Sequence, residues 1–155
     1  MDFSVQVSNF ILQPTDHNRV VPVFERLLKP GGKLAILTMM ELPLEDPIAD
    51  ASEKLILKYN PDWSGAGQKR HPILLPPIYT ETFEEETNLV FDLKVHFTRE
   101  SWNGRMKACR GVGASLPKEQ IALFEKEHQA MLQSIAPEKF DVLHCAAIRT
   151  FRCVK

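Results

Sequence analysis

The sequence has no uninterrupted apolar stretch long enough to cross a lipid bilayer as a helix. Its N-terminal segment, MDFSVQVSNFILQ, has no basic cluster of the kind that opens a secretory signal peptide. The formal net charge is only −1, so no overall electrostatic attraction draws the chain to nucleic acid or to anionic membranes. These absences argue against membrane and nucleic-acid partners, and we expect a cytoplasmic protein.

Cysteine is scarce, and its spacing does not indicate disulfide or metal chemistry. Cys109, Cys145 and Cys153 form no CxxC pair, and an odd number does not fit a closed disulfide framework. We therefore expect reduced, buried thiols. Cys109 has Lys107 and Arg110 close by, and basic neighbours leave open the alternative of an activated, nucleophilic thiol. No pair of His or Cys residues has metal-ligand spacing, so no metal site is expected.

The first third of the chain has the pattern of strand, helix and strand. Ser4–Leu12 alternates and then becomes apolar, which favours a strand but leaves a helix open. Asp16 is a plausible N-cap for a helix over Val20–Leu28, which ends at Pro30 and Gly31. Lys33–Met40 is almost entirely apolar, which is typical of a central strand covered on both faces.

The middle of the chain predicts a helix, a long loop and another strand. Ile48–Tyr59 has helical spacing of its apolar residues. Asn60–Pro77 is rich in Gly and Pro and is either a binding loop or a simple connector. Tyr79–Glu86 is acidic and is a possible short helix, and Asn88–Phe97 alternates cleanly, with Leu89, Phe91, Leu93, Val95 and Phe97 sharing one face.

The last third predicts two helices and a final strand. The helices are expected near Trp102–Cys109 and over Lys118–Ile135, and the strand over Phe140–Val154. His128 lies on the apolar stripe of the second helix and is expected to be a core residue, whereas His96 faces outward. This alternation of elements predicts an α/β layered fold around a mostly parallel sheet, and 155 residues suffice for one domain.

Five stretches of the sequence carry a family resemblance. SVQVSNFILQPTDHNRVVPVFERLL and LLKPGGKLAIL are similar to the region of the fourth strand and to the helix end, turn and fifth strand of class I S-adenosylmethionine-dependent methyltransferases. FTRESWNGRMKACRGVGASL, WSGAGQKRHPI and FEKEHQAMLQSIAPEKFDVLH resemble a subgroup of that family that acts on small molecules. Together these stretches cover nearly the whole chain.

The resemblance implies an α/β fold with a partial Rossmann-like methyltransferase sheet. This sheet would be mixed, with the family's strand order 4-5-7-6 and with helices on both faces. Residues 1–155 would form a single domain, with a Gly/Pro-rich loop at 60–77 and a helical insertion at 98–136.

The departure from the family concerns the cofactor. The family's first strand ends in a glycine-rich turn, and an acidic residue ends its second strand. Only glycine lets the backbone approach the cofactor so closely, and a carboxylate accepts the ribose hydroxyl protons. Here Gly31–Lys33 follows a helix, and Trp63–Gly67 follows no strand. We therefore expect the C-terminal portion of a methyltransferase, in which S-adenosyl-L-methionine is the cofactor by resemblance and this chain alone does not bind it.

The resemblance places the methionine end of the cofactor near the carboxyl end of the family's fourth strand. It thereby implies Ser8, Asn9, Phe10 and His17 as cofactor-binding residues. The alternative is a strand end followed by a capped turn, with no ligand contact.

The substrate side is expected around a cluster of basic and aromatic residues. Arg beside Trp suits a carboxylate or phosphate on a flat substrate, through bidentate hydrogen bonds and stacking. The alternative is that Trp102 anchors the core and that the basic residues form a solvated face. The predicted substrate-binding residues are Trp63, His71, Arg99, Trp102, Arg105 and Arg110.

The order 4-5-7-6 would make the segment 4–12 an edge strand with unpaired backbone groups, which is a template for pairing. We expect a homodimer through this edge, or a partner chain that supplies the missing half. The predicted function is that of a methyltransferase-like protein acting on a small molecule, inactive as a lone chain. The alternative is a non-catalytic module for small-molecule binding or oligomerisation.

Overall fold

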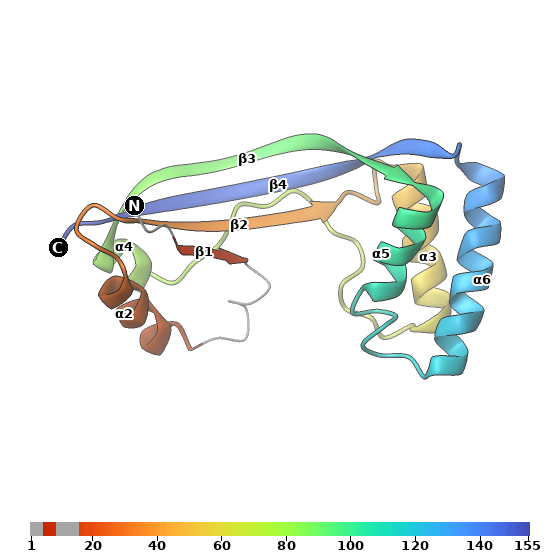
Figure 1. Cartoon of the computed structure of the whole chain (residues 1–155), viewed down its shortest axis with the longest axis horizontal. Helices are drawn as coiled ribbons and strands as arrows, with labels where there is room; N and C mark the ends of the chain where they lie inside the picture. Colours follow the sequence, from red (N-terminus) through yellow and green to blue (C-terminus); the bar gives the residue numbers. More distant parts are fainter. Residues whose placement is uncertain (1–4, 9–15) are drawn as a thin grey trace. The chain divides into compact units, whose positions relative to one another are not determined.

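The computed structural model describes residues 5–8 and 16–155, and side chains from Asp16 onward. Its elements are β1 (Val5–Ser8), α2 (His17–Leu27), β2 (Lys33–Glu41), α3 (Pro47–Tyr59), α4 (Ile78–Thr82), β3 (Phe83–Thr98), α5 (Arg99–Ala108), α6 (Lys118–Ile135) and β4 (Lys139–Cys153) (Figure 1). Of the strand expected over Ser4–Leu12, the structure describes Val5–Ser8 as β1, and the rest lies outside the described residues.

The chain divides into two compact units, each built from separate stretches of sequence. The first unit consists of Met1–Met39, Arg70–Phe91 and Ala146–Lys155, and the second of Met40–Lys69 and Asp92–Cys145. Strands β2, β3 and β4 each have residues in both units. The single domain expected over residues 1–155 stays a prediction.

The four strands form one mixed sheet in the order β1-β2-β4-β3 (Figure 1). β1 runs parallel to β2, with Val5 opposite Leu34. β4 runs antiparallel to β2, since the amide of Cys153 donates to the carbonyl of Gly32 at one end of the pair and that of Leu42 to Leu143 at the other. Only one pair of neighbouring strands is therefore parallel, because β4 is inserted in reverse between β2 and β3.

Helix boundaries follow local capping signals in the sequence. The Asp16 carboxylate accepts a hydrogen bond from the amide of Asn18 and caps α2, as predicted. At the end of this helix, Gly31 adopts a φ of 73° and turns the chain into β2. Asp46 caps α3, and its second carboxylate oxygen accepts from the amide of Leu143 on β4, 2.9 Å away.

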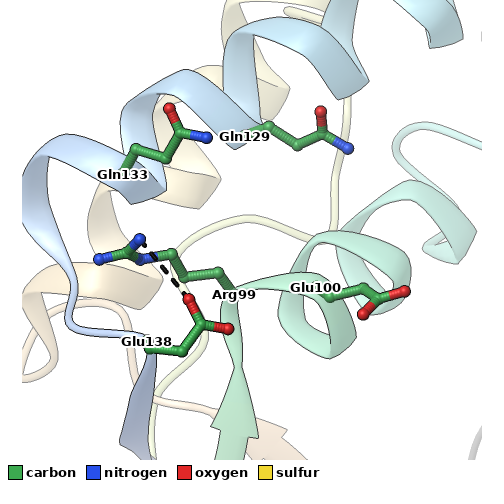
Figure 2. A pocket seen from close by; sticks show the side chains of 5 residues that line it. All are labelled: Arg99, Glu100, Gln129, Gln133 and Glu138. Carbon is green, nitrogen blue, oxygen red and sulfur yellow. Dashed lines mark ion pairs between the residues drawn. The ribbon is translucent and has the colours of Figure 1, made fainter.

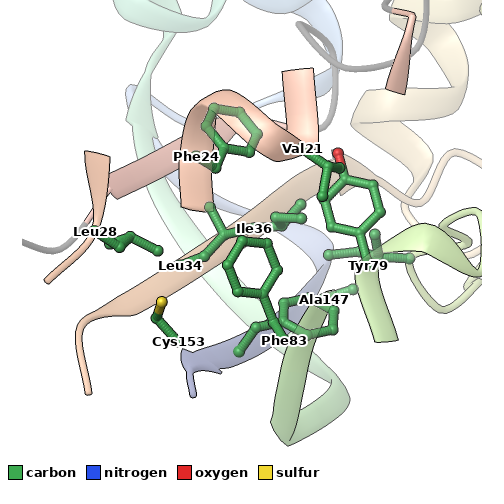
Figure 3. Packing of buried hydrophobic residues seen from close by; sticks show 11 residues of the cluster. Val21, Phe24, Leu28, Leu34, Ile36, Tyr79, Phe83, Ala147 and Cys153 are labelled. Carbon is green, nitrogen blue, oxygen red and sulfur yellow. The ribbon is translucent and has the colours of Figure 1, made fainter. Parts of the chain in front are cut away.

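In the first unit, α2 and α4 cover one face of the sheet (Figure 3). Their shared apolar cluster comprises Val21, Phe24, Leu28, Leu34, Ile36, Ile73, Tyr79, Phe83, Ala147, Phe151 and Cys153. On the opposite face, Leu37 and Met39 of β2 are 39% and 45% exposed. Within the described part of this unit, the expected helices on both faces are not found. The expectation that Lys33–Met40 is covered on both faces is wrong, because β2 alternates between buried and exposed side chains.

In the second unit, α3, α5 and α6 pack around a separate core. Its fully buried members include Ile56 of α3, Trp102 of α5, and Phe124 and Leu132 of α6. The helix predicted over Lys118–Ile135 is confirmed with these bounds. Both helices between β3 and β4 fall within the helical insertion expected at 98–136.

The region before α5 differs from the prediction in two ways. The short helix expected over Tyr79–Glu86 ends at Thr82, and the acidic residues instead begin β3, where Glu84 and Glu85 pair with arginines of β4. The apolar face expected to be buried on this strand is open in its centre, with Leu89 55% and Phe91 49% exposed. β3 lies at the edge of the sheet, which explains why its side chains have fewer neighbours.

Candidate functional site

The hollowed surface of the second unit lies between α5 and α6. One pocket of about 220 Å³ is lined by Arg99 and Glu100 at the start of α5, by Gln129 and Gln133 of α6, and by Glu138 (Figure 2). A second pocket, of about 470 Å³, shares two of these residues. It is lined by Thr98, Glu100, Ser101, Asn103, Gly104, Lys107, Glu125 and Gln129. We refer to the two together as the α5–α6 groove.

Helix capping fixes the entrance of the groove. The hydroxyl of Thr98 accepts from the amide of Ser101, and the Ser101 hydroxyl accepts from the amide of Thr98, so the two residues form a capping box. Arg99 follows at once, and its Nε donates to the carbonyl of Ala136 at 2.9 Å. Its Nη1 lies 3.6 Å from a carboxylate oxygen of Glu138, the ion pair drawn in Figure 2. Arg99 is thereby held across the gap between the two helices.

The chemistry of the groove is that of polar recognition. Carboxylates, amides and one guanidinium supply both donors and acceptors, and the Lys107 ammonium is engaged by Glu125 at 2.8 Å. These groups suit hydroxyls, amines or amides of a small ligand. The lining includes no cysteine or histidine, and its only hydroxyls, those of Thr98 and Ser101, belong to the capping box.

A buried polar network lies directly beneath the groove. Asn103, which lines the larger pocket, has its Oδ1 2.8 Å from Nδ1 of His128. Nε2 of His128 lies 3.0 Å from Oγ of Ser52, which also accepts from Nε1 of Trp102 at 2.9 Å. Ser52, Trp102 and His128 are fully buried, so the network ties α3, α5 and α6 together in the interior.

Ser52, His128 and Asn103 are linked in the same order as a nucleophile, a base and an orienting amide in an enzyme active site. The geometry nevertheless favours a structural role. The Ser52 hydroxyl donates to the carbonyl of Ile48, so its proton is already engaged. Burial lowers the pKa of His128 to about 4, which leaves the imidazole neutral near pH 7. Neither pocket of the groove includes Ser52, so a substrate has no path to its oxygen in this arrangement.

The predicted substrate residues have different environments. Arg99 lies in the α5–α6 groove. Trp102 is a fully buried core residue, and Arg105 lies with its guanidinium 6.0 Å from the Trp102 ring while it pairs with Glu41 at 2.6 Å. Arg110 is exposed, and its carbonyl accepts from Ser115.

The two loop residues of that set belong to different units. Trp63 is half-buried against the core of the second unit. His71 is in the first unit, with Nδ1 3.0 Å from the carbonyl of Pro72. A substrate site built from all six predicted residues stays a prediction.

The residues implied for the cofactor can be tested only in part. Ser8 ends β1, and Asn9 and Phe10 lie outside the described residues. His17 begins α2, and its Nδ1 lies 3.1 Å from the hydroxyl of Tyr79. No glycine precedes Gly31 in the sequence, and the Gly31 amide already donates a hydrogen bond to the carbonyl of Cys153. The described residues therefore do not fit S-adenosylmethionine by themselves, because no glycine turn after a strand admits it.

Several residues of the groove were not anticipated from the sequence. Glu125, Gln129 and Gln133 follow one another at intervals of four, which places them on one polar stripe of α6. That stripe is the signal that could have identified the groove. Apart from Arg99, the residues that α5 contributes gave no such signal, because their contribution depends on how α5 packs against α6.

Two points raised by the sequence, the reactivity of Cys109 and the binding of a metal, can be addressed for the part of the chain that the structure describes. Cys109 is half-buried, and burial raises the pKa of its thiol, so the activated nucleophile left open by the sequence is not favoured. Among residues 16–155, His, Cys, Asp and Glu side chains form no group of three that could hold a metal ion. None of the described helices is both long and apolar enough to span a membrane.

Comparison with known proteins gives structural likenesses but no family. No protein-family profile matches the chain, and no curated protein matches it. Among solved structures, it is similar to a candidate methyltransferase from Bacillus halodurans C-125, with 15% sequence identity and a TM-score of 0.37. The match covers 96% of this chain and 63% of that protein, so the chain spans less than two thirds of its length.

Proposed function

We propose that the chain forms the C-terminal part of a class I S-adenosylmethionine-dependent methyltransferase fold and binds a polar small molecule in the α5–α6 groove. The observation that carries the proposal is the strand order β1-β2-β4-β3, in which β4 is reversed between β2 and β3. If β1 to β4 correspond in chain order to the family's fourth to seventh strands, this order becomes 4-5-7-6 with an antiparallel last strand. That is the order that the sequence resemblance implies.

The turn between α2 and β2 supports the same assignment. The KPGG segment ends a helix and opens the buried strand β2, which is where the resemblance expects it. Gly31 has a positive φ, and Gly32 leaves too little space for a Cβ, which would lie 2.9 Å from the carbonyl oxygen of Lys29. The geometry of the turn therefore requires glycine at both positions.

The cofactor is the part of the proposal that this chain does not complete. S-adenosylmethionine would supply an activated methyl group, and a glycine loop from outside these 155 residues would be needed to hold it. Another polypeptide or another part of a longer chain could bring that loop to β1, which is the first strand of the sheet in the described part of the chain. Pairing of two copies through the segment 4–12 is the alternative assembly at the same edge.

The groove is the proposed acceptor site. Its glutamines and glutamates bind hydroxyls and amines without a net requirement for an anionic substrate, and Arg99 can still donate from its terminal nitrogens. The acceptor in this proposal is therefore a polar, hydroxyl- or amine-bearing small molecule.

The test is a calorimetric titration with S-adenosylhomocysteine on protein whose mass has been fixed by light scattering. We expect no binding by the lone chain. The titration is then repeated on a chimera in which the first three strands of a class I methyltransferase, with their glycine turn, are fused before Met1. We expect binding to appear in the chimera and to vanish in a matched chimera whose turn glycines are changed to valine. Micromolar binding by the lone chain would contradict the incomplete-pocket proposal, and a folded chimera without binding would contradict the family assignment.

The second candidate is a non-catalytic small-molecule-binding module. It is favoured by the groove lining, which contains no cysteine or histidine and whose two hydroxyls are engaged in the capping box. This candidate predicts ligand binding in the groove that a Gln129→Leu substitution weakens, with no binding of S-adenosylhomocysteine in either chimera.

A further inference from the structure

Asn103 is the only buried residue in the lining of the α5–α6 groove, with 4% of its surface exposed. Its Oδ1 lies 2.8 Å from Nδ1 of His128, so that half of the amide is engaged in the interior. Among residues 16–155, the only fully enclosed side-chain nitrogen or oxygen without a hydrogen-bond partner is Nε2 of His144. Nδ2 of Asn103, which has no partner among the described residues, is therefore open to the pocket that this residue lines.

The Asn103 amide is held in place before any ligand arrives. His128 is fully buried, and its other ring nitrogen lies 3.0 Å from Oγ of Ser52, so the side chain that anchors Asn103 is itself anchored. A donor held in this way loses little conformational freedom when it binds a ligand. A ligand that covers an N–H group without accepting its hydrogen bond loses free energy. The larger pocket therefore favours a ligand that places an oxygen against Nδ2 of Asn103.

The carboxylate of Glu100 carries the uncompensated charge of the groove. Arg99 is paired with Glu138, and Lys107 is paired with Glu125. Glu100 has no ion pair among the described residues, and in Figure 2 its carboxylate points away from the Arg99–Glu138 pair. It lies in the first turn of α5, where the helix amides favour a negative charge. The groove should therefore attract a cationic group.

One small molecule can contact Glu100 and Asn103 together. The two residues are three positions apart on α5, so their side chains are neighbours on one helix face. Both line the larger pocket, whose volume of about 470 Å³ is typical of a small-molecule site. Gly104 lines the same pocket, and a Cβ at this position would meet nothing within 4 Å, so the space beside Asn103 is open.

We propose that the ligand of the larger pocket is an amino alcohol, of which amino sugars are one kind. Its ammonium group binds the Glu100 carboxylate, and a neighbouring hydroxyl oxygen accepts a hydrogen bond from Nδ2 of Asn103. The proposal rests on the assignment of the α5–α6 groove as the ligand site, and it narrows the ligand to molecules that carry both groups. A neutral polyol leaves Glu100 without a counter-charge, and a simple amine leaves the Asn103 N–H groups covered but unpaired.

The test is an NMR titration of the full, ¹⁵N-labelled chain with three matched probes. Glucosamine carries both groups, glucose lacks the amine, and cyclohexylamine lacks the hydroxyls. We expect glucosamine to bind most tightly and to shift the side-chain amide signal of Asn103. Cyclohexylamine should not shift that signal in the direction that hydrogen bonding produces, because it offers Nδ2 no oxygen.

Two substitutions assign the two contacts. Glu100→Gln should weaken the binding of glucosamine about threefold, as expected for an exposed ion pair, and should leave glucose unchanged. Glu119→Gln is the matched control, since this exposed carboxylate occupies the first turn of α6 outside the groove and should change nothing. Asn103→Leu should weaken glucosamine and glucose about fivefold and leave cyclohexylamine unchanged.

A third substitution tests occupancy of the groove without disturbing the buried network. Gly104→Leu extends a side chain into open space in the pocket and should weaken all three probes. Thermal unfolding of each variant separates loss of binding from loss of folding, which matters for Asn103→Leu because it also removes a contact of His128.

The outcomes distinguish this proposal from the one on which it rests. Equal binding of glucose and glucosamine that Gly104→Leu weakens would overturn the amino-alcohol proposal and leave the groove as the ligand site. Glucosamine binding that neither Gly104→Leu nor Gln129→Leu weakens would contradict both, because the ligand would then lie elsewhere. Absence of binding by all three probes would also overturn the amino-alcohol proposal, whereas the titration of the chimera with S-adenosylhomocysteine tests the family assignment independently.

Discussion

The Nε2 atom of His128 lies 3.0 Å from the Oγ atom of Ser52, and both side chains are fully buried. Ser52 also accepts from the Trp102 indole and donates to the carbonyl of Ile48, so this one hydroxyl joins three helices. The arrangement is costly to disturb, because each buried polar group depends on a neighbour for its hydrogen bond.

Protonation of His128 should destabilise the fold in acid. Burial lowers the pKa of this imidazole from 6.5 to about 4. Between these two pH values the unfolded chain binds more protons, so this contribution to stability is lost as the pH falls from 6.5 toward 4. The loss attributable to His128 is about 3 kcal/mol at most. Urea unfolding at several pH values measures it.

His128→Gln provides the control for that measurement. Glutamine keeps a donor and an acceptor near Ser52 and Asn103 but does not titrate. The variant should show a flatter dependence of the free energy of unfolding on pH between 4 and 6.5. An unchanged slope would mean that other groups cause the acid sensitivity.

Removing the Ser52 hydroxyl should lower the free energy of unfolding. Ser52→Ala leaves the Trp102 N–H and a His128 nitrogen without their partner in the interior. We expect a loss of about 2–3 kcal/mol in the free energy of unfolding, since each unsatisfied buried group costs about 1–3 kcal/mol. Ser134→Ala is the matched control, because its exposed hydroxyl contacts only the carbonyl of Met131. Equal effects of the two substitutions would contradict the importance of the network.

Two glycines of the second unit should respond in opposite directions to alanine. A Cβ at Gly111 would lie 2.7 Å from the Ile56 side chain and 2.8 Å from the Trp63 ring, so Gly111→Ala should cost about 1–3 kcal/mol. A Cβ at Gly104, within α5, meets nothing within 4 Å, so Gly104→Ala should stabilise by about 0.5–1 kcal/mol. Chemical unfolding measures both, and Trp fluorescence reports displacement of Trp63 in the first variant.

Replacing Arg149 with lysine should destabilise the protein. Its Nε and Nη2 bind both oxygens of Glu85 at 3.0 and 2.9 Å, and Nη1 donates to the carbonyl of Ile73. Lysine cannot reproduce this fork, so Arg149→Lys should lose about 1–2 kcal/mol of stability. Arg152→Lys, at a side chain 43% exposed, should change stability by about 0.5 kcal/mol or less. Similar losses at both positions would show that the bidentate geometry is unimportant.

The sequence predicted the elements whose signals are local. Asp16 was identified as a cap, and Lys118–Ile135 as a helix, because capping and helical periodicity depend on neighbours along the chain. The apolar alternation of β3 predicted a strand but not its exposure, because periodicity does not tell whether another layer covers a face. The same limit explains why β2 was expected to be covered on both faces.

The candidate site was harder to predict than the fold. The cluster of basic and aromatic residues predicts both Arg99 and Trp102 as binding residues, but only Arg99 lies in the α5–α6 groove, whereas Trp102 lies in the core. The contact between Ser52 and His128 joins positions 76 residues apart, so no local pattern reveals it. The stripe of Glu125, Gln129 and Gln133 was readable, but polar residues at helical spacing more often face solvent alone.

The division of the sequence between the two units bears on how fast each can fold. The second unit joins two stretches of sequence, Met40–Lys69 and Asp92–Cys145, whereas the first joins three. In the core of the first unit, Val21 and Phe24 belong to one cluster with Phe151 and Cys153. Contacts between positions so far apart in the sequence form slowly, because a long loop has to close before they can stabilise the chain. The helical second unit is therefore expected to fold before the first.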